Sequence, residues 1–424
     1  MRVELLTVGD ELLLGFTVDT NAAFLARTLA AEGIAITRRS TVGDDAESIA
    51  AAVEEALSRT GAVITTGGLG PTSDDATKPA IARLFGRELT LDEEILRDIQ
   101  EKFRRFGYRG EMPPGNRQQA LIPEHARILY NKHGTAPGIW LEDERGRWVA
   151  MLPGVPREMR GMTEDTLVPL LRERLRAINN GVPRVVLSRT IRTTGIGESA
   201  LAQALGDDER EIDGIPVAYL PGWEGVDLRL TVRDRTREDA ERTLDAAAAH
   251  VYARVARHVY GEDGTDLAAV VLDLARARGL RIATAESCTG GMLGARITAV
   301  PGSSDVYAGG VVAYENAVKE QLLGVSPNTL AAHGAVSEEV VREMAQGVRA
   351  ALGTAIGVGI TGIAGPGGGT ADKPVGTVWL GAAVENEVRA ARRQFVGDRE
   401  EIRRRACQSA LEMVRQMLSG ASGR

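Results

Sequence analysis

Apolar and polar positions in the first third of the chain follow the pattern of strands that alternate with helices. Short apolar and β-branched runs at Val3–Val8, Ile34–Val42 and Ala62–Thr66 predict three buried strands. Helical patterns fill the two intervals between them, and we expect the first helix to be capped by Asn21 and the second to start at Asp44. This β-α-β-α-β order predicts a parallel sheet covered by helices.

Further elements are expected before residue 180. Leu91–Phe106 has a helical pattern, and segment 107–118, which contains glycine and proline, predicts a loop. The segments Gly138–Glu142 and Arg147–Leu152 flank a D-E-R-G turn and predict a hairpin. Pro156 is expected to open a long helix, because proline is favoured in the first helical turn.

Two breaks in the pattern predict domain boundaries. The first is Asn-Asn-Gly-Val-Pro at 179–183, and the second is Gly-Glu-Asp-Gly at 261–264. We therefore expect three domains: an N-terminal α/β domain over residues 1–175, a small α+β domain over 182–258, and a second α/β domain over 264–424. The N-terminal sheet is expected to be parallel or mixed, with helices on both faces.

Composition narrows the class of protein. The 424 residues carry a net charge of −7, and 43% of them are hydrophobic, which is enough for globular cores. The two cysteines, Cys288 and Cys407, are too few for a disulfide framework or a structural zinc site. Acidic residues in the N-terminal apolar stretch argue against a signal peptide, and no segment has the composition of a membrane helix. The acidic total argues against nucleic acid as the main partner. We therefore expect a soluble cytoplasmic protein.

Glycine is in excess, at 49 residues, and one glycine-containing turn in the C-terminal domain joins an expected strand to an expected helix. It reads Ala-Glu-Ser-Cys-Thr-Gly-Gly at 285–291, which places Ser287 and Cys288 near the N–H groups of a helix N-terminus. Serine becomes a nucleophile only beside a base. Lys319 is the candidate base, since desolvation lowers the pKa of a lysine and since His333 lies in an ordinary loop. In the alternative interpretation, Ser287 is a helix N-cap and Lys319 is a solvated surface residue.

A second glycine-rich segment, 359–369, follows another expected strand. Gly357, Gly359 and Gly362 formally match G-x-G-x-x-G, but a dinucleotide-binding motif requires a helix directly afterwards, and Gly-Pro-Gly-Gly-Gly follows instead. We interpret the segment as a lid or an anion-binding nest, with a flexible connector as the alternative.

Three blocks in this domain, A-E-S-C-T-G-G, Y-E-N-x-x-K and G-I-T-G-x-A-G-P-G-G, resemble the nicotinamide mononucleotide deamidase family, the C-terminal half of the CinA proteins. The resemblance implies an amidohydrolase that needs no cofactor and converts the carboxamide of the nucleotide to a carboxylate with release of ammonia. It implies Ser287 as the nucleophile, assisted by Lys319 and Tyr314, with Cys288 as the competing nucleophile. Substrate contacts, including oxyanion donors in the turn, are implied for Thr289, Gly290, Gly291, Thr361, Gly362 and Arg399.

The N-terminal domain carries its own glycine-rich turn after an expected strand. The segment Thr-Thr-Gly-Gly-Leu-Gly-Pro-Thr-Ser-Asp-Asp at 65–75 brings glycine N–H groups and hydroxyls to a helix start, which suits phosphate. Asp74 and Asp75 would repel a bound anion unless a divalent metal ion lay between the carboxylates and the anion. Helix N-capping is their alternative role. Asp10 follows the first strand at the same edge of the sheet, so it is placed to share a metal with Asp75.

Together with G-D-E-L at 9–12, this turn resembles the molybdopterin-binding fold, and N-R-Q, N-x-x-G-T-A-P-G and L-P-G-V-P-x-E-M resemble the N-terminal half of CinA. The resemblance implies hydrolysis of ADP-ribose to AMP and ribose 5-phosphate with a divalent metal, Co²⁺ or Mg²⁺, and K⁺ is a further candidate ion. The expected metal ligands are Asp10, Asp44 and Asp75. The expected substrate contacts are Gly67, Gly68, Gly70, Thr72, Lys78, Asn116 and Arg117.

The middle segment resembles the small KH-like domain of CinA. Gly195-Ile-Gly197-Glu-Ser stands where an RNA-binding KH module needs a G-x-x-G loop with basic flanks, so we expect a structural linking domain. The whole chain is expected to be a homodimeric enzyme with two activities, on nicotinamide mononucleotide and on ADP-ribose. A molybdopterin-binding or molybdenum-cofactor enzyme and a non-catalytic, competence-related regulatory protein are the alternatives.

Overall fold

The computed structural model describes residues 1–72, 74–105, 107–108, 110, 112–178, 184–208 and 210–420. It divides into two compact units, one of residues 1–187 with 232–242 and the other of residues 188–231 with 243–424. The expected linker at 179–183 lies outside the described residues, as do Phe106, the expected end of a helix, and residues 109 and 111 of an expected loop. Most of the expected middle domain belongs to the same unit as the C-terminal segment.

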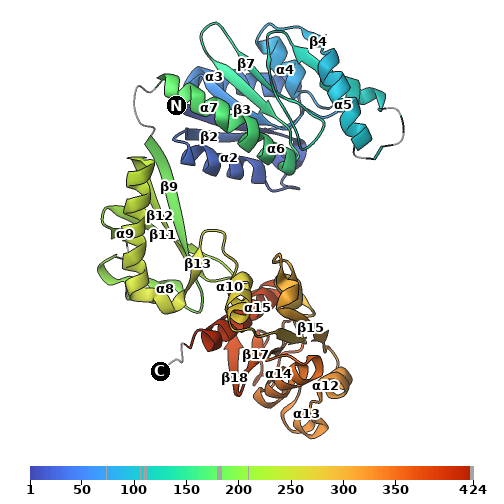
Figure 1. The fold of residues 1–424 in the computed structure, drawn as a ribbon, viewed down its shortest axis with the longest axis vertical. Coiled ribbons are helices and arrows are strands. Elements are labelled where there is room, and N and C mark those ends of the chain that lie inside the picture. The colour runs from blue at the N-terminus through green and yellow to red at the C-terminus, as the bar shows by residue number, and fades with distance from the viewer. Residues whose placement is uncertain are drawn as a thin grey trace. The chain divides into compact units, whose positions relative to one another are not determined.

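A mixed six-stranded sheet forms the centre of the first unit (Figure 1). Four strands run parallel in the order β2-β1-β3-β8, and β7 and β6 continue the sheet in antiparallel pairing, which confirms the expected parallel-to-mixed sheet and its hairpin. The strands are β1 (Arg2–Val8), β2 (Ala35–Val42), β3 (Ala62–Thr66), β6 (Arg127–Leu129), β7 (Gly138–Glu142) and β8 (Trp148–Leu152), and β4 (Leu89–Leu91) pairs separately with β5 (Leu121–Pro123).

Helices cover both faces of this sheet, because successive residues of a strand point to opposite sides. Leu5 packs in a core with α2, α6 and α7, whereas Leu6 packs in a second core with α3, α4 and α5. The helices are α1 (Asp10–Leu13), α2 (Thr20–Ala31), α3 (Ala46–Thr60), α4 (Thr77–Leu84), α5 (Glu93–Arg105), α6 (Pro156–Met162) and α7 (Val168–Ile178), with a π-helical turn at Thr163–Leu167.

Two local predictions in this unit are corrected. Asp19 caps α2 in place of Asn21: the Asp19 carboxylate accepts the N–H of Ala22, and Asn21 lies inside the first turn. The segment expected as a loop at 107–118 runs into a 3₁₀ helix, Pro114–Ala120, because two consecutive prolines restrict the backbone at its start.

The middle segment forms the small α+β arrangement that the sequence predicts, with strand order β10-β11-β12-β9-β13. Its elements are β9 (Arg184–Thr193), α8 (Glu198–Leu205), β10 (Glu211–Ile212), β11 (Ile215–Pro221), β12 (Val226–Thr236), α9 (Arg237–Val255) and β13 (Val259–Glu262). Within the second unit, Glu224 at the β11–β12 turn pairs with Arg296 (3.0 Å), and Gln408 donates to Thr194 Oγ1 (3.2 Å). Polar contacts of this kind suit a linking domain.

The second unit contains a further five-stranded sheet, in the order β15-β14-β16-β17-β18. The first three strands, β15, β14 and β16, are parallel to one another. β17 pairs antiparallel with β16, and β18 pairs antiparallel with β17. Its elements are α10 (Leu267–Ala277), β14 (Ile282–Glu286), α11 (Met292–Thr298), β15 (Tyr307–Val312), α12 (Asn316–Leu323), α13 (Pro327–His333), α14 (Glu338–Leu352), β16 (Ile356–Gly362), β17 (Thr377–Val384), β18 (Glu387–Gln394) and α15 (Arg399–Leu418). The pattern predicts neither α12 nor α13, because both are short.

The carboxyl ends of β14 and β16 meet at one edge of this sheet, because the two strands are parallel neighbours. β14 ends at Glu286, directly before Ser287, and β16 ends at Gly362 in the glycine-rich segment. Two motifs that lie far apart in the sequence are therefore adjacent in space. In the part of the chain that the structure describes, no helix is both long and apolar enough to cross a membrane.

Candidate active sites

A pocket of about 280 Å³, here called the serine pocket, lies at the carboxyl ends of β14 and β16. Among the described residues, the expected Thr289, Gly290 and Gly291 do not belong to its wall. The expected residues that do line it are Ser287, Cys288, Tyr314, Lys319, Thr361, Gly362 and Arg399.

Ser287 is held by its backbone at the start of the turn. Its N–H donates to the carbonyl of Ile360 in β16 (2.9 Å), and its own carbonyl accepts the N–H of Gly290 (3.1 Å). The residue is 9% exposed, and Oγ makes no hydrogen bond to any described residue. The hydroxyl is therefore available to a molecule in the pocket.

Lys319 is buried in the wall of the serine pocket, with 1% of the residue exposed. Its Nζ donates to the carbonyls of Ala313 (2.8 Å) and Tyr314 (3.2 Å), and no carboxylate among the described residues pairs with it. Desolvation lowers the pKa of the Lys319 ammonium below its usual 10.5. A neutral amine has two N–H groups, which the two carbonyls satisfy, and one lone pair, which remains free to accept a proton. The burial contradicts the alternative of a solvated surface lysine.

Tyr314 and Arg399 lie together at the mouth of the pocket. Arg399 is the first residue of α15, and its guanidinium donates to the carbonyl of Gly365 (2.5 Å) and to Tyr314 Oη (3.3 Å). Tyr314 is 61% exposed, and its hydroxyl makes no hydrogen bond to Ser287 or Lys319. In this geometry the Tyr314 hydroxyl contacts Arg399 rather than the serine or the lysine.

Cys288 is a less suitable nucleophile than its neighbour. The residue is 5% exposed and belongs to the apolar core beneath the pocket. Burial raises the pKa of the Cys288 thiol to about 12, so the thiol stays protonated at neutral pH. Since the thiolate is the reactive form of cysteine, this geometry favours Ser287.

The expected anion site at the start of α11 is filled by the chain itself. Glu286 Oε2 accepts the N–H groups of Gly291 (3.1 Å) and Leu293 (3.0 Å), and Oε1 accepts the N–H of Gly294 (2.8 Å). The N–H of Gly290 also has an acceptor, a carbonyl earlier in the turn. These hydrogen bonds contradict the expectation that Gly290 and Gly291 donate to an oxyanion.

Two expected threonines support the pocket walls. Thr289 is fully buried, and its carbonyl accepts a hydrogen bond from Arg403 in α15 (2.6 Å). Thr361 is also buried, and its hydroxyl donates to the carbonyl of Ala335 (2.8 Å). Their hydrogen bonds join the serine turn to α15, and β16 to the segment before α14.

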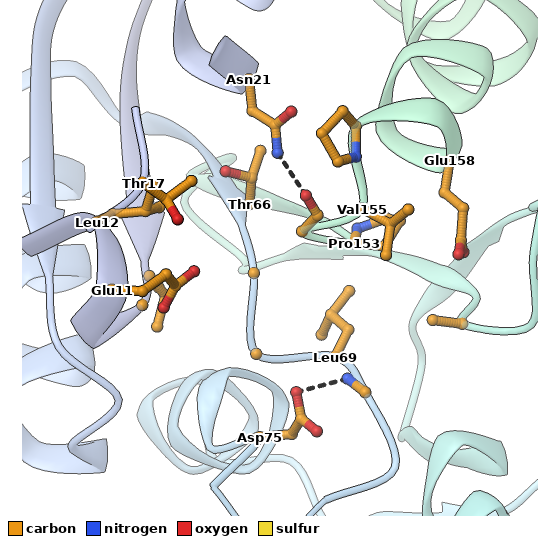
Figure 2. Close-up of a pocket in the computed structure, with 18 of the residues that line it drawn as sticks. Glu11, Leu12, Thr17, Asn21, Thr66, Leu69, Asp75, Pro153, Val155 and Glu158 are labelled. Carbon is orange, nitrogen blue, oxygen red and sulfur yellow. Dashed lines mark hydrogen bonds between the residues drawn. The ribbon is translucent and has the colours of Figure 1, made fainter. Parts of the chain in front are cut away.

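A larger pocket of about 520 Å³, here called the glycine-loop pocket, lies at the carboxyl ends of β1 and β3 in the first unit (Figure 2). The expected residues in its wall are Gly67, Gly68, Gly70 and Asp75. The expected residues that the structure places outside the wall are Asp10, Asp44, Thr72, Lys78, Asn116 and Arg117.

Asp75 holds the glycine loop in place. Its Oδ1 accepts the N–H of Gly70 (2.7 Å), and its Oδ2 accepts both the N–H (2.8 Å) and the hydroxyl (2.6 Å) of Thr72. Neither Asp75 nor Asp74 caps α4, whose N-cap is Ala76. The carboxylate occupies donors that the sequence suggested for phosphate.

The expected three-carboxylate metal site is not assembled. Asp44 Oδ2 accepts the backbone N–H of Asp10 (3.1 Å), whereas Asp75 faces the glycine loop. The described residues include no group of three or more His, Cys, Asp or Glu side chains that could hold a metal ion. These carboxylates therefore do not fit a resident divalent ion.

Lys78, Asn116 and Arg117, which the sequence suggests as substrate contacts, do not line the glycine-loop pocket. Lys78 is buried and donates to the carbonyls of Gln118 (2.5 Å) and Gln119 (3.4 Å), and desolvation lowers its pKa to about 8. Residues three apart share one side of a 3₁₀ helix, so Asn116 lies beside Gln119, to which it donates (3.1 Å). Gln119 reaches the pocket wall, while Arg117 is exposed.

Sequence reasoning missed several residues of this pocket. Asn21 Nδ2 donates to the carbonyl of Gly154 (2.7 Å), while Asn21 Oδ1 and Thr66 Oγ1 are buried without a partner in the described residues. Glu11 lies on another side of the pocket, and its carboxylate has no partner in the part described (Figure 2). The wall holds four acidic side chains and, within the described residues, no basic one; the acids are Glu11, Asp19, Asp75 and Glu158.

Three family models match the chain in succession. They are a probable molybdopterin binding domain at residues 4–173, the KH domain of damage-inducible protein CinA at 188–261, and the CinA C-terminal domain at 264–418. A CinA-like protein of Gemmatimonas aurantiaca is 58% identical over 100% of this chain and 98% of its own length. A putative competence-damage inducible protein of Moorella thermoacetica is 43% identical over 98% of both chains.

One similar solved structure is that of competence/damage inducible protein CihA from Agrobacterium tumefaciens. It is 40% identical, covers 36% of this chain and 93% of its own, and has a TM-score of 0.35. The full-length relatives and the three successive domain matches show the family of the chain. The chain belongs to the CinA family, with a molybdopterin-binding-like domain, a KH domain and a CinA C-terminal domain in that order.

Proposed function

We propose that the second unit hydrolyses the carboxamide of nicotinamide mononucleotide to a carboxylate and ammonia. One observation carries the proposal: the same pocket is lined by a serine hydroxyl that has no hydrogen-bond partner among the described residues and by a desolvated lysine that has no carboxylate partner among them. Serine and lysine together can perform acyl transfer without histidine or metal. Membership of the CinA family supports the choice of substrate.

In the proposed reaction, Ser287 Oγ attacks the amide carbon while its proton passes to Lys319 Nζ. The lysine then gives that proton to the nitrogen that leaves as ammonia, and an acyl group remains on the serine. Water attacks this ester with Lys319 again as the base, which releases the carboxylate and restores the serine hydroxyl.

The segment 364–368 supplies the oxyanion donors in this proposal. Its residues Ala364, Gly365, Gly367 and Gly368 line the same pocket as Ser287, and their N–H groups donate to no acceptor among the described residues. Backbone N–H groups that are free and already in place stabilise a developing oxyanion well. Arg399, the exposed cation in the described part of the wall, would bind the phosphate of the nucleotide.

The test is a substrate comparison with the purified full chain. Ammonia and the carboxylate product are measured for nicotinamide mononucleotide, for nicotinamide riboside and for nicotinamide. We expect hydrolysis of the mononucleotide and a raised KM for the riboside, because the riboside lacks the phosphate that Arg399 would bind. Absence of ammonia from all three compounds would contradict the proposal and favour the non-catalytic regulatory alternative.

We propose that the first unit hydrolyses the diphosphate of ADP-ribose to AMP and ribose 5-phosphate. Its pocket of about 520 Å³ has the size of a ligand site, and the unpartnered oxygens of Asn21 and Thr66 suit hydroxyl groups such as those of ribose. The described wall has four acidic side chains and no basic one, so it would repel a diphosphate that carries no bound cation. Dependence on divalent cations is therefore part of this proposal, although the carboxylates form no resident site.

Its test is AMP formation from ADP-ribose in the presence of Co²⁺, Mg²⁺ or EDTA, each with and without K⁺. Equilibrium binding of molybdopterin is measured in parallel. Tight molybdopterin binding together with intact ADP-ribose would favour the molybdenum-cofactor alternative. Light scattering of the same sample tests the expected homodimer.

A further inference from the structure

Glu286 is a buried carboxylate directly before the proposed nucleophile. It is the last residue of β14 and is 2% exposed. Its side chain does not enter the described wall of the serine pocket but turns to the first turn of α11. A buried charge costs stability unless hydrogen bonds satisfy it, so such a residue needs a structural or functional reason.

The hydrogen bonds of Glu286 replace a missing helix cap. The N-cap residue of α11 is Gly291, whose φ of 92° is in the left-handed region and which has no side chain to accept the free N–H groups. The Glu286 carboxylate accepts three of them, from Gly291, Leu293 and Gly294, at 2.8–3.1 Å. A negative charge at a helix N-terminus also interacts favourably with the helix dipole.

This cap ties the nucleophile to three surrounding elements. Glu286, the residue before Ser287, accepts N–H groups of α11. The Ser287 N–H donates to the Ile360 carbonyl of β16. After the serine, the Thr289 carbonyl accepts a hydrogen bond from Arg403 of α15. The serine thus lies between fixed points on both sides. Because β14 and α11 are joined through the Glu286 side chain, a shift of that side chain would move the turn that carries Oγ.

We propose that Glu286 is a positioning residue for Ser287: by capping α11 from the end of β14, it sets the direction of Ser287 Oγ and withdraws the α11 N–H groups from the reaction. The inference rests on the proposed function only in taking Ser287 as the nucleophile. It requires no particular amide substrate.

The test uses the full chain with Glu286→Gln, which keeps the size of the side chain but replaces one acceptor oxygen with an NH₂ group. Two quantities are measured: the rate at which a fluorophosphonate probe labels Ser287, followed by peptide mass spectrometry, and kcat and KM for nicotinamide mononucleotide. We expect the labelling rate and kcat to fall by roughly 10- to 100-fold with KM within about twofold, as misplacement of a reacting atom produces.

Glu412→Gln is the matched control. Glu412 is another buried carboxylate of the same unit, paired with Arg415 (2.7 Å) in α15 and absent from the described pocket wall. Its substitution also disrupts a buried polar contact, and we expect its labelling rate to stay within about twofold of the wild type, since an effect on Ser287 requires the α11 cap.

Three results with a folded Glu286→Gln chain would overturn the inference: labelling at the wild-type rate, an increase in labelling once the α11 N–H groups are freed, or a raised KM with unchanged kcat. If the glutamine variant does not fold, Glu286→Asp replaces it, since it keeps the charge but is too short to reach all three N–H groups. Unfolding of both variants also overturns the inference, because a purely structural cap then explains the contacts. If the wild-type chain is labelled at Ser287 but releases no ammonia from nicotinamide mononucleotide, the proposed substrate is wrong. The Glu286 inference is unaffected by that result.

Discussion

The two glycine-rich turns of this chain both look like phosphate-binding sites in the sequence. In the structure, a carboxylate of the chain itself accepts hydrogen bonds from each turn. In the first unit, Asp75 accepts from Gly70 and Thr72. In the second, Glu286 accepts from the glycines that open α11. Each turn offers N–H groups suited to phosphate, but a carboxylate of the chain already binds some of them. In both turns, therefore, an acid of the chain takes donors that a bound anion would need.

The turns differ in what lies beside them. Ser287 and the buried Lys319 line the serine pocket, whose mouth carries Arg399. The glycine-loop pocket has acids in its wall and, in the part described, no basic side chain. The same backbone motif thus accompanies a desolvated base in one unit and an acidic cavity in the other, and the chemistry depends on the neighbours of the turn.

The largest expected effect separates the two adjacent candidates in the serine turn. Ser287→Ala should lower ammonia release from nicotinamide mononucleotide by at least about 10³-fold, since it removes the attacking atom. Cys288→Ala should retain most of the activity, because the Cys288 thiol is buried and has a raised pKa. Activity that survives in the first variant and disappears in the second would assign the nucleophile to Cys288.

Lys319→Met tests the base that distinguishes the serine pocket. Loss of a general base should reduce kcat by roughly 10²- to 10⁴-fold. In the wild type, the neutral amine is the active form, so kcat/KM should rise with pH and level off above the Lys319 pKa. Burial lowers that pKa, so the plateau should begin below pH 10.5. A profile that still rises at pH 10.5, or that is unchanged in the methionine variant, would exclude Lys319 as the base.

Asp75→Ala tests whether the acid in the first turn is structural. The substitution removes three hydrogen bonds, each worth about 1 kcal/mol, so the apparent unfolding temperature of the first unit should fall. The divalent-ion concentration for half-maximal ADP-ribose hydrolysis should stay within about twofold if Asp75 is not a ligand. Asp10→Ala is the comparison, since the Asp10 side chain accepts no hydrogen bond from a described residue. A tenfold shift for Asp75→Ala would restore it as a metal ligand.

The last prediction concerns how the stability of the first unit depends on pH. The pKa of Lys78 is lowered to about 8 in the folded chain, from 10.5, so the folded state binds fewer protons than the unfolded state between these values. Stability should therefore rise with pH from about 8 to 10.5, and Lys78→Met should remove that slope. Thermal unfolding across this pH range measures it. A slope that is equal in both proteins would show that Lys78 does not cause it.

The strand and helix pattern could be predicted well because it depends on local periodicity. The alternation of Leu5 and Leu6 between two cores follows directly from the geometry of a strand. Short helices such as α12 and the 3₁₀ helix at Pro114–Ala120 were harder, since a few residues carry little periodic signal. The sequence pattern places the cap of α2 two residues too late, because asparagine and aspartate have similar local preferences for the N-cap position.

The sequence by itself determined the order of domains, the strands that end in glycine turns, and the serine and lysine of the second unit. Only the tertiary structure decided which polar groups face a pocket and which are already satisfied. Lys78 and Asp75 look like ligand contacts along the chain, yet each binds the protein. Hydrogen-bond partners come from segments far apart in sequence, and a donor that has one acceptor is no longer available to a second. For that reason, a motif identifies the turn, but the packing around it decides what the turn can bind.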